Sequence, residues 1–507
     1  MDGGATNRKR ASGALRVPSG PRYYRVLSSQ GSWDRHMPEG HSMRSYARWG
    51  AGMLGFAMMI HLVPARAAGQ QNPHQDGLGN ATFALAGDGI ITRKLSVYQE
   101  PEFLEIRDLV RSATAAFINA EMLFLDYDEP ETFPASQSGG TYMRAEPELA
   151  EELAWMGFDL VSTANNHSLD YSFGGLRSNT LWLRRAGLVA AGTGDNLAEA
   201  RAPRYLETQG GRVALVAVSS SFVDFNRAGP QRKDMQGRPG LSPLRVETTY
   251  YVPGERFQQL QQLRTELGMR GGGTDDRIQL FGNTFVRGDA YRVTTSVNPE
   301  DLEEITAAVR DAKRQANWVI VSSHTHQGGG DVADFLAEFT HAVVDAGADM
   351  FVGHGTHVLR GIEIYKGKPI FYSLGDFLFQ NETVELQPWE NYRSTGLGND
   401  ALPGKFYDAR IEQGGGSFPA RAEIWEAVVA VPVFQAGQLT RVDLHPITLG
   451  FGLPRPQRGR PLAAKGELAR KIIEDLRDLS APLGTEISFE NGIGVIRVGS
   501  GSDSGGS

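Results

Sequence analysis

The sequence contains no cysteine among its 507 residues. This absence excludes disulfide bonds, iron–sulfur clusters, zinc sites built on thiolates and a thiol nucleophile. No Walker A sequence or Gly-x-Ser-x-Gly elbow occurs, and Gly87-Asp88-Gly89 lacks the further glycines of a dinucleotide fingerprint. With 40% hydrophobic and 22% charged residues, the chain has the composition of an ordinary globular protein.

Long apolar runs are also scarce, and the one that stands out lies near the N-terminus. Arg44 and Arg48 precede an apolar run over residues 49–63, which is followed by Ala65-Arg66-Ala67. A positive flank, a short apolar run and small residues at an Ala-x-Ala site are typical of a secretory signal peptide. The run is shorter than the ~20 residues of a membrane span. We therefore expect residues 1–67 to be an N-terminal extension and signal peptide of a periplasmic or extracellular protein, with a membrane anchor as the alternative.

Acidic residues outnumber basic residues in the chain beyond this segment. Residues 1–67 carry ten of the 51 Lys and Arg but only three of the 59 Asp and Glu, so residues 68–507 have 41 basic and 56 acidic residues and a net charge of −15. Nucleic-acid binding needs a cationic surface that neutralises phosphates. We expect no nucleic-acid partner.

From residue 82 the chain alternates short apolar runs with amphipathic runs, which is the pattern of an α/β fold. Strands are predicted at residues 82–86, 116–120, 158–163, 212–218, 318–323, 349–352 and 368–373. Helices are predicted after Pro101, Pro147 and Asn298-Pro299, and at residues 332–346 and 466–480.

The same pattern suggests boundaries. We expect a linker at residues 68–81, a main domain at 82–385, an exposed insertion loop at 386–416, and C-terminal strands and a helix at 417–498 that complete the fold, followed by a flexible tail at 499–507. Gly- and Pro-rich loops are also expected at 224–245 and 271–276. The C-terminal unit could be a separate domain or a flank of the same sheet.

Polar residues of metal-ligand type follow one predicted strand after another. Five of the chain's eleven histidines lie in these positions. In open α/β sheets, ligands bind beyond the carboxyl ends of the strands, and a mixed set of imidazole and oxygen donors suits Mn, Fe or Zn. The residues in chain order are Asp88, Glu121, Asn166, His167, Asp170, His324, His326, His354 and His357.

These segments resemble a known family. LAGDGI, INAE, STANNHSLDYSFGGL, VIVSSHTH and DAGADMFVGHGTHVLRGIEIYKGKPIFYSLGDFLF are similar to text of the CapA-type capsule or poly-γ-glutamate synthesis proteins, over about residues 82–379. That family in turn resembles the calcineurin-like metallophosphoesterases. The resemblance implies a four-layer α/β/β/α fold, here with a small C-terminal α+β extension.

The resemblance also implies roles for the residues, and one or two divalent metal ions. Asp88 and His357 would serve one metal, and Asn166, His324 and His354 a second, with Glu121 between them. His167 would donate a proton to the leaving oxygen. Asp170 is interpreted as an orienting partner of His167, with helix capping as the alternative.

This chain departs from the family pattern at several positions. The wider phosphoesterases carry an Asp-x-His motif, and in this chain Ile90 stands at the position of its histidine. One metal ligand of that pattern is therefore missing. His326 is interpreted as a solvated loop residue, with a ligand or a substrate contact as alternatives. Asp376 is interpreted as a turn or capping residue, with a contact to a metal ligand as the alternative. A one-metal site is therefore an alternative.

Two functions follow from the resemblance. The first is an envelope hydrolase that acts on a phosphoester, or on an amide. The second is a non-catalytic protein that binds an envelope polymer or a membrane-bound polymer synthase.

Overall fold

The structure is a computed structural model that describes residues 79–135, 140–269, 271, 273–326, 332–413 and 418–499. The expected signal peptide, nearly all of the linker and most of the tail lie outside these residues. No helix among the described residues is long and apolar enough to cross a membrane.

Most described strands belong to two sheets, as an α/β fold requires. The larger sheet has ten strands, in the order β23 (Ser488–Glu490), β24 (Ile493–Arg497), β21 (Gln438–Thr448), β20 (Glu426–Gln435), β1 (Ala81–Ile90), β2 (Ala115–Ala120), β5 (Leu160–Ser162) and β6 (Val189–Ala191), with β19 (Asp376–Phe379) on β1 and β22 (Leu462–Ala463) on β21. The second sheet has the order β17 (Leu359–Tyr365), β18 (Lys368–Leu374), β16 (Met350–His354), β15 (Trp318–His324), β9 (Gly211–Ser219) and β8 (Arg204–Thr208). Each strand predicted from the sequence is present.

Smaller sheets complete the strands. A four-stranded sheet has the order β12 (Arg277–Leu280), β13 (Asn283–Gly288), β11 (Val246–Pro253) and β14 (Arg292–Val297). Two pairs join β10 (Gly240–Leu241) to β7 (Thr193–Gly194) and β3 (Leu123–Phe124) to β4 (Arg144–Ala145).

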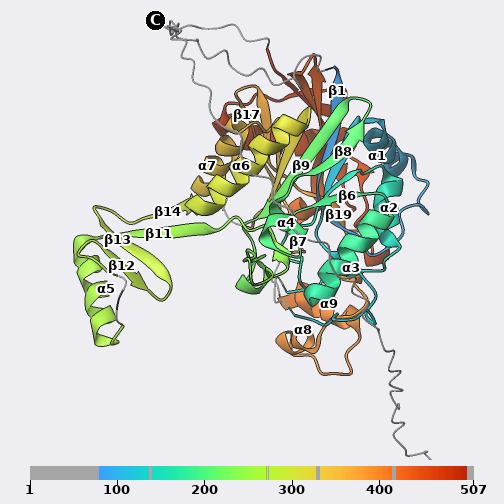
Figure 1. The fold of residues 1–507 in the computed structure, drawn as a ribbon. Coiled ribbons are helices and arrows are strands. Elements are labelled where there is room, and N and C mark those ends of the chain that lie inside the picture. Colours follow the sequence, from blue (N-terminus) through green and yellow to red (C-terminus); the bar gives the residue numbers. More distant parts are fainter. Residues whose placement is uncertain are drawn as a thin grey trace, which may run out of the picture. The chain divides into compact units, whose positions relative to one another are not determined.

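The described helices lie between and beside these strands (Figure 1). They are α1 (Pro101–Ser112), α2 (Leu149–Met156), α3 (Ser172–Arg185), α4 (Leu197–Arg201), α5 (Gly254–Glu266), α6 (Pro299–Gln315), α7 (Asp334–Asp345), α8 (Trp389–Ser394), α9 (Pro403–Gln413) and α10 (Gly466–Ser480). The helix starts agree with the sequence. Pro101 and Pro299 open α1 and α6, and the Asn298 side chain accepts a hydrogen bond from the Asp301 N–H.

Successive side chains of β1 belong to two different clusters of the apolar core. Phe83 and Leu85 pack in a cluster with side chains of β9, β15 and β16 of the second sheet, whereas Ala84 and Ala86 pack in a cluster with α1, α2 and α3. This is expected because successive side chains of a strand point to opposite faces. A third cluster joins the second sheet to α6 and α7, which lie side by side in Figure 1.

The C-terminal strands are a flank of the larger sheet and not a separate domain. β20 pairs antiparallel with β1, and β21 pairs with β20 and β24. α10 packs its apolar face, which includes Ile472 and Leu476, into the cluster shared with the second sheet.

The segment expected to be an exposed loop, residues 386–416, contains two helices in its described part, residues 386–413. This segment forms α8 and α9, and Phe406 and Tyr407 of α9 are fully buried. Tyr407 donates a hydrogen bond to the Val384 carbonyl. Gly and charged residues suggested a loop because the apolar residues that anchor the helix are few.

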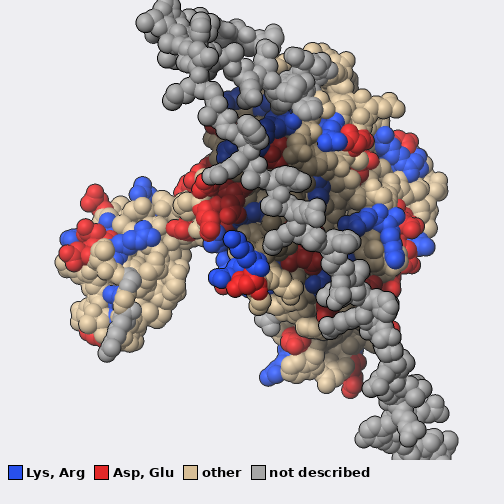
Figure 2. Space-filling view, viewed as in Figure 1, with Lys and Arg blue, Asp and Glu red and all other residues tan. Residues whose placement is uncertain are grey.

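A small lobe formed by β11–β14 and α5 was not predicted from the sequence. It has its own cluster of buried side chains, Val252, Phe257 and Ile278. Its strands are largely half-buried or exposed, so their apolar periodicity is weak. In the face shown in Figure 2, acidic and basic side chains are interspersed.

A buried ion-pair network holds the start of α6. Asp301 is fully buried and accepts hydrogen bonds of 2.8 Å from both the backbone N–H and the Nε of Arg245. It also pairs with Arg201, whose side chain is 7% exposed and which contacts Glu304 as well. Burial raises the pKa of Asp301, but the hydrogen bonds from Arg245 and the pairing with Arg201 outweigh it, so its pKa lies below its ordinary value.

We expect Asp301→Asn to lower the free energy of unfolding at pH 7 by ~3 kcal/mol, because loss of one partner leaves a buried charge poorly compensated. Since the pKa of Asp301 is depressed, its stabilisation is present above about pH 4 and is lost as the pH falls through its pKa in the folded protein. The difference between variant and parent should therefore shrink in acid. Urea unfolding at several pH values measures it. The exposed neighbour Glu300, which pairs with Arg245 at 2.7 Å, provides the control Glu300→Gln, with an expected change below ~0.5 kcal/mol. Equal effects of both variants would contradict the assignment.

Candidate metal centre

The candidate residues lie where strands of both large sheets end. Asp88 is near the end of β1, Glu121 directly follows β2, and the loop with Asn166, His167 and Asp170 follows β5. His324 and His354 are the last residues of the neighbouring parallel strands β15 and β16. His357 lies in the turn after β16 and has a positive φ of 58°.

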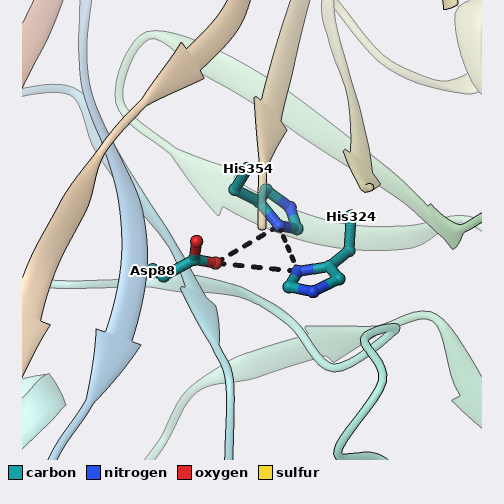
Figure 3. Close-up of side chains that lie close together, drawn as sticks. All are labelled: Asp88, His324 and His354. Carbon is teal, nitrogen blue, oxygen red and sulfur yellow. Dashed lines mark hydrogen bonds and ion pairs between the residues drawn. The ribbon is translucent and has the colours of Figure 1, made fainter. Parts of the chain in front are cut away.

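Asp88 forms one group with two histidines. Its Oδ1 lies 3.7 Å from His324 Nδ1 and 3.4 Å from His354 Nδ1, and the two imidazole nitrogens are 3.0 Å apart (Figure 3). All three side chains are fully buried. One ligand atom of each lies within 4.8 Å of the others, so the three could hold one metal ion.

Glu121 forms a second group with His326 and His357. Its Oε1 lies 3.9 Å from His326 Nε2 and 3.7 Å from His357 Nε2. His357 Nδ1 in turn lies 2.9 Å from Asp376 Oδ1. Asp88, Glu121, His357 and Asp376 make a further set with metal-binding spacing, so Asp88 belongs to both sides of the cluster.

This grouping differs from the pairing that the resemblance implies. His324 and His354 lie with Asp88, and His357 lies close to both carboxylates. Asn166 lines the same cavity, and its carbonyl accepts a hydrogen bond of 3.0 Å from Asn226 Nδ2. The structure thus places the predicted residues close together, in groups that differ from the implied pairing, and their roles as ligands stay a prediction.

The environment of Glu121 tests whether these residues fit a cation. Both of its carboxylate oxygens are buried, and neither accepts a hydrogen bond within the described residues. Instead its Oε1 faces imidazole nitrogens of His324, His357 and His167 at 3.5, 3.7 and 3.8 Å. Ligand atoms that each lie ~2.0–2.2 Å from one metal ion are separated by about such distances. The donor set, carboxylate with imidazole, fits a divalent transition metal.

The pKa values of the cluster follow from its burial. Burial raises the pKa of Glu121 well above its ordinary value and lowers that of His354 to about 3. Burial also lowers the pKa of His357, but the charges of Glu121 and Asp376 outweigh it and raise the pKa to about 10. The raised pKa values of Glu121 and His357 thus favour their protonated forms, whereas the lowered pKa of His354 favours the neutral imidazole. Metal binding would compete with these protons.

His167 and Asp170 form a closely spaced pair beside the metal-ligand groups. His167 Nδ1 lies 2.6 Å from Asp170 Oδ2, which also accepts a hydrogen bond of 2.8 Å from the Met143 N–H. Asp170 is fully buried. An imidazole held at Nδ1 by a carboxylate presents its Nε2 in a fixed direction.

The site also contains residues that the sequence did not single out or interpreted mainly in another role. His326 was interpreted as solvated, with a ligand as one alternative; its side chain is 38% exposed, and its Nε2 lies 3.3 Å from His324 Nε2. Asp376 contacts His357 directly. Asn119 donates a hydrogen bond of 2.7 Å to Asp88 Oδ1, and Ser322 Oγ lies 2.7 Å from His354 Nε2. The signal for Asn119 and Ser322 was their position on strands that carry a ligand.

Two glycines allow the close approach of these elements. A Cβ at Gly87 would lie 1.8 Å from the Gly375 carbonyl oxygen, where β1 meets the turn before β19. Gly355 has φ +98°, its N–H donates to Asp88 Oδ2 at 2.7 Å, and a Cβ there would lie 2.9 Å from the His324 ring. Other residues at these positions would displace the cluster.

The cluster opens into a cavity of about 910 Å³. Glu121, Asn166, His167, His326 and His357 line it, so the cavity gives a ligand access to the cluster.

Comparison with known proteins identifies relatives. The family described as bacterial capsule synthesis protein PGA_cap matches residues 62–381. An uncharacterised protein of Sinorhizobium fredii is 36% identical over 435 residues, 82% of this chain and 93% of its own length. The PGA biosynthesis protein CapA of Bacillus subtilis is 26% identical over 258 residues, 50% of each chain. A probable polyglutamine synthesis accessory protein of Mycobacterium tuberculosis is 28% identical over 48% of this chain and 50% of its own.

The family match spans more than half of the chain, and it includes the segments that carry Asp88, Glu121, His167, His324 and His357. The motifs on which the resemblance rests lie within this match. The chain therefore belongs to the PGA_cap family of bacterial capsule synthesis proteins.

Proposed function

We propose that this protein is an exported, metal-dependent hydrolase of the cell envelope that acts on a phosphoester or amide bond during capsule polymer synthesis. The observation that carries the proposal is the buried carboxylate of Glu121, which accepts no hydrogen bond within the described residues and faces four imidazoles. A polymer-binding surface has no need of such a group, because burying a carboxylate without hydrogen bonds is costly.

The fold we infer for this function is the four-layer α/β/β/α arrangement of the metallophosphoesterases. It is supported by the three apolar clusters: one shared by the two large sheets, one between the larger sheet and α1–α3, and one between the second sheet and α6 and α7.

The residues that would hold metal are the two groups around Asp88 and Glu121, with Asn166 beside them. We propose Mn, Fe or Zn, as one or two ions, because both imidazole and carboxylate donors are present. A bound metal would supply Lewis-acid activation of the scissile group and of water. Ile90 stands where the wider phosphoesterases have a histidine ligand. His326, which has metal-binding spacing with Glu121 and His357, is a candidate for the missing ligand.

The chain's own residues then provide binding and proton transfer. His167, with Nδ1 fixed by Asp170, directs Nε2 toward Glu121 and lines the cavity. When water adds to the scissile centre and the bond to the leaving group breaks, the His167 Nε2–H is placed to protonate the leaving oxygen or nitrogen. Asp170 stabilises the charged imidazole that precedes this transfer.

Family membership supports the envelope assignment. Relatives are named for PGA or polyglutamine synthesis. We propose an envelope polymer or a phosphoester as the substrate, and a membrane-bound polymer synthase as the partner. The apolar run at residues 49–63 supports export to the periplasm or the cell exterior.

The second candidate function is a non-catalytic accessory protein that binds envelope polymer or a synthase. One relative is named as an accessory protein, and the substitution at Ile90 removes a ligand that the wider phosphoesterases have. Turnover separates the two candidates.

We expect the purified protein to contain near-stoichiometric Mn, Fe or Zn, and a His354→Ala/His357→Ala variant to lose it, because each half of the cluster loses an imidazole. Elemental analysis after reconstitution with each metal measures this. His341→Ala is the control, since His341 lies outside the cluster and contacts Glu363 at 2.9 Å. Absence of metal from the reconstituted parent protein would refute the metal-dependent mechanism.

We expect His167→Gln to lower kcat by a factor of ~10²–10⁴ while metal content stays unchanged, because general acid catalysis contributes about this much. A panel of aryl phosphoesters and γ-glutamyl peptides serves as substrate, and Asp170→Asn should show a smaller loss. Unaltered turnover in His167→Gln would remove its assigned role. A metal-loaded parent protein with no turnover on either class would favour the accessory function.

A further inference from the structure

An arginine from the helical insertion at residues 389–413 lines the same cavity as the metal-ligand groups. This residue, Arg410, lies on α9, and Glu121, His167 and His357 line the cavity with it. Its guanidinium carbon lies 5.3 Å from the centre of the Phe418 ring. Phe418 in turn packs on His357, with 4.9 Å between ring centres. One aromatic side chain therefore separates the arginine from the cluster.

One nitrogen of the Arg410 guanidinium has no hydrogen-bond partner within the part of the chain that is described. This atom is Nη1, which is fully buried. Tyr407 and Glu382 are the groups whose charges influence Arg410. Glu382 accepts a hydrogen bond of 2.8 Å from Arg458 Nε through its Oε2, and no hydrogen bond joins Glu382 to Arg410 among the described residues. Burial lowers the pKa of Arg410, which indicates that the charge is held in an environment that does not fully solvate it.

The acidic side chains of the cavity wall that follow Arg410 in sequence have other partners. Glu426 and Asp475 contact Lys471 at 2.6 and 2.8 Å, and Asp478 lies 3.5 Å from Arg477. Arg421 is itself basic and lies 3.5 Å from Glu423, with both side chains more than half exposed. A desolvated guanidinium without a carboxylate is costly, and it is stabilised when an anion of matching geometry binds. The cavity that Arg410 helps to line has the space for such an anion.

We propose that Arg410 binds an anionic oxygen group of the substrate, a phosphate or a carboxylate, next to the metal centre. The substrate class is thus one that carries a negative charge beside the bond at His167. The inference rests on the proposed function only in treating this cavity as the substrate site. Anion binding by Arg410 itself does not require turnover.

The test is anion binding to the full chain, by isothermal titration calorimetry with inorganic phosphate and with glutarate as separate probes. Measurements on chelator-treated protein isolate the arginine from any metal. We expect Arg410→Gln to weaken binding of the preferred probe by about tenfold or more. Arg410→Lys should lose less, since it keeps the charge but not the planar fork.

The matched control is Arg393→Gln, which removes an exposed arginine of α8 in the same insertion. The guanidinium carbon of Arg393 lies 4.9 Å from the centre of the Trp389 ring. Parent-like affinity of this control, and unchanged metal content in Arg410→Gln, would support the assignment. Preference for phosphate or for glutarate identifies the anion class.

Equal affinity of Arg410→Gln and the parent for both probes would overturn the proposal, as would no binding of either probe to the chelated parent. If Arg410→Gln fails to fold, as a thermal melt would reveal, the comparison of Arg410→Lys with the parent decides. Failure of the proposed function has a different signature: it leaves phosphate or glutarate binding intact but shows no metal or no turnover.

Discussion

Two buried carboxylates determine how the rest of the centre is built. Asp88 and Glu121 are both fully buried and lie at the ends of adjacent strands, β1 and β2. Placing two negative groups in an apolar core is unfavourable unless positive charge accompanies them. His357, beyond the end of β16, brings positive charge to these carboxylates, because its pKa is raised to about 10. Burial lowers the pKa values of His324 and His354, so the ends of β15 and β16 contribute neutral imidazole nitrogens. The apolar cluster that joins the two large sheets therefore also fixes which strand ends meet at the site.

Much of this could be predicted from the sequence because it depends on local patterns. Apolar runs gave the strands of both large sheets, and proline and asparagine gave the starts of α1 and α6. Strand ends with Asp88, His324 and His354 pointed to one edge of the fold. What local pattern could not give is which ligand faces which, since His326 and Asp376 reach the cluster only through the turn geometry after β15 and β18.

The missed regions share a physical cause. The helices at residues 389–413 are held by few buried side chains, and Gly, Pro and charged residues interrupt the apolar pattern of the sequence. The strands of the small lobe are mostly half-buried or exposed. Yet the first of these regions supplies Arg410 to the cavity wall. A segment with weak folding signals can thus be the part that distinguishes one member of a family from another, because binding groups need position more than they need a large core.

The lobe formed by β11–β14 and α5 has a simple attachment. Val246, at the start of β11, pairs directly with Val297, at the end of β14, so the chain leaves and returns at one point. The small apolar cluster around Phe257 lies wholly inside this excursion. Because the two ends of the lobe meet, the entropy cost of closing this loop does not change with the positions of the strands in the large sheets. The lobe could therefore become longer or shorter in evolution while the ligand-bearing strands keep their register.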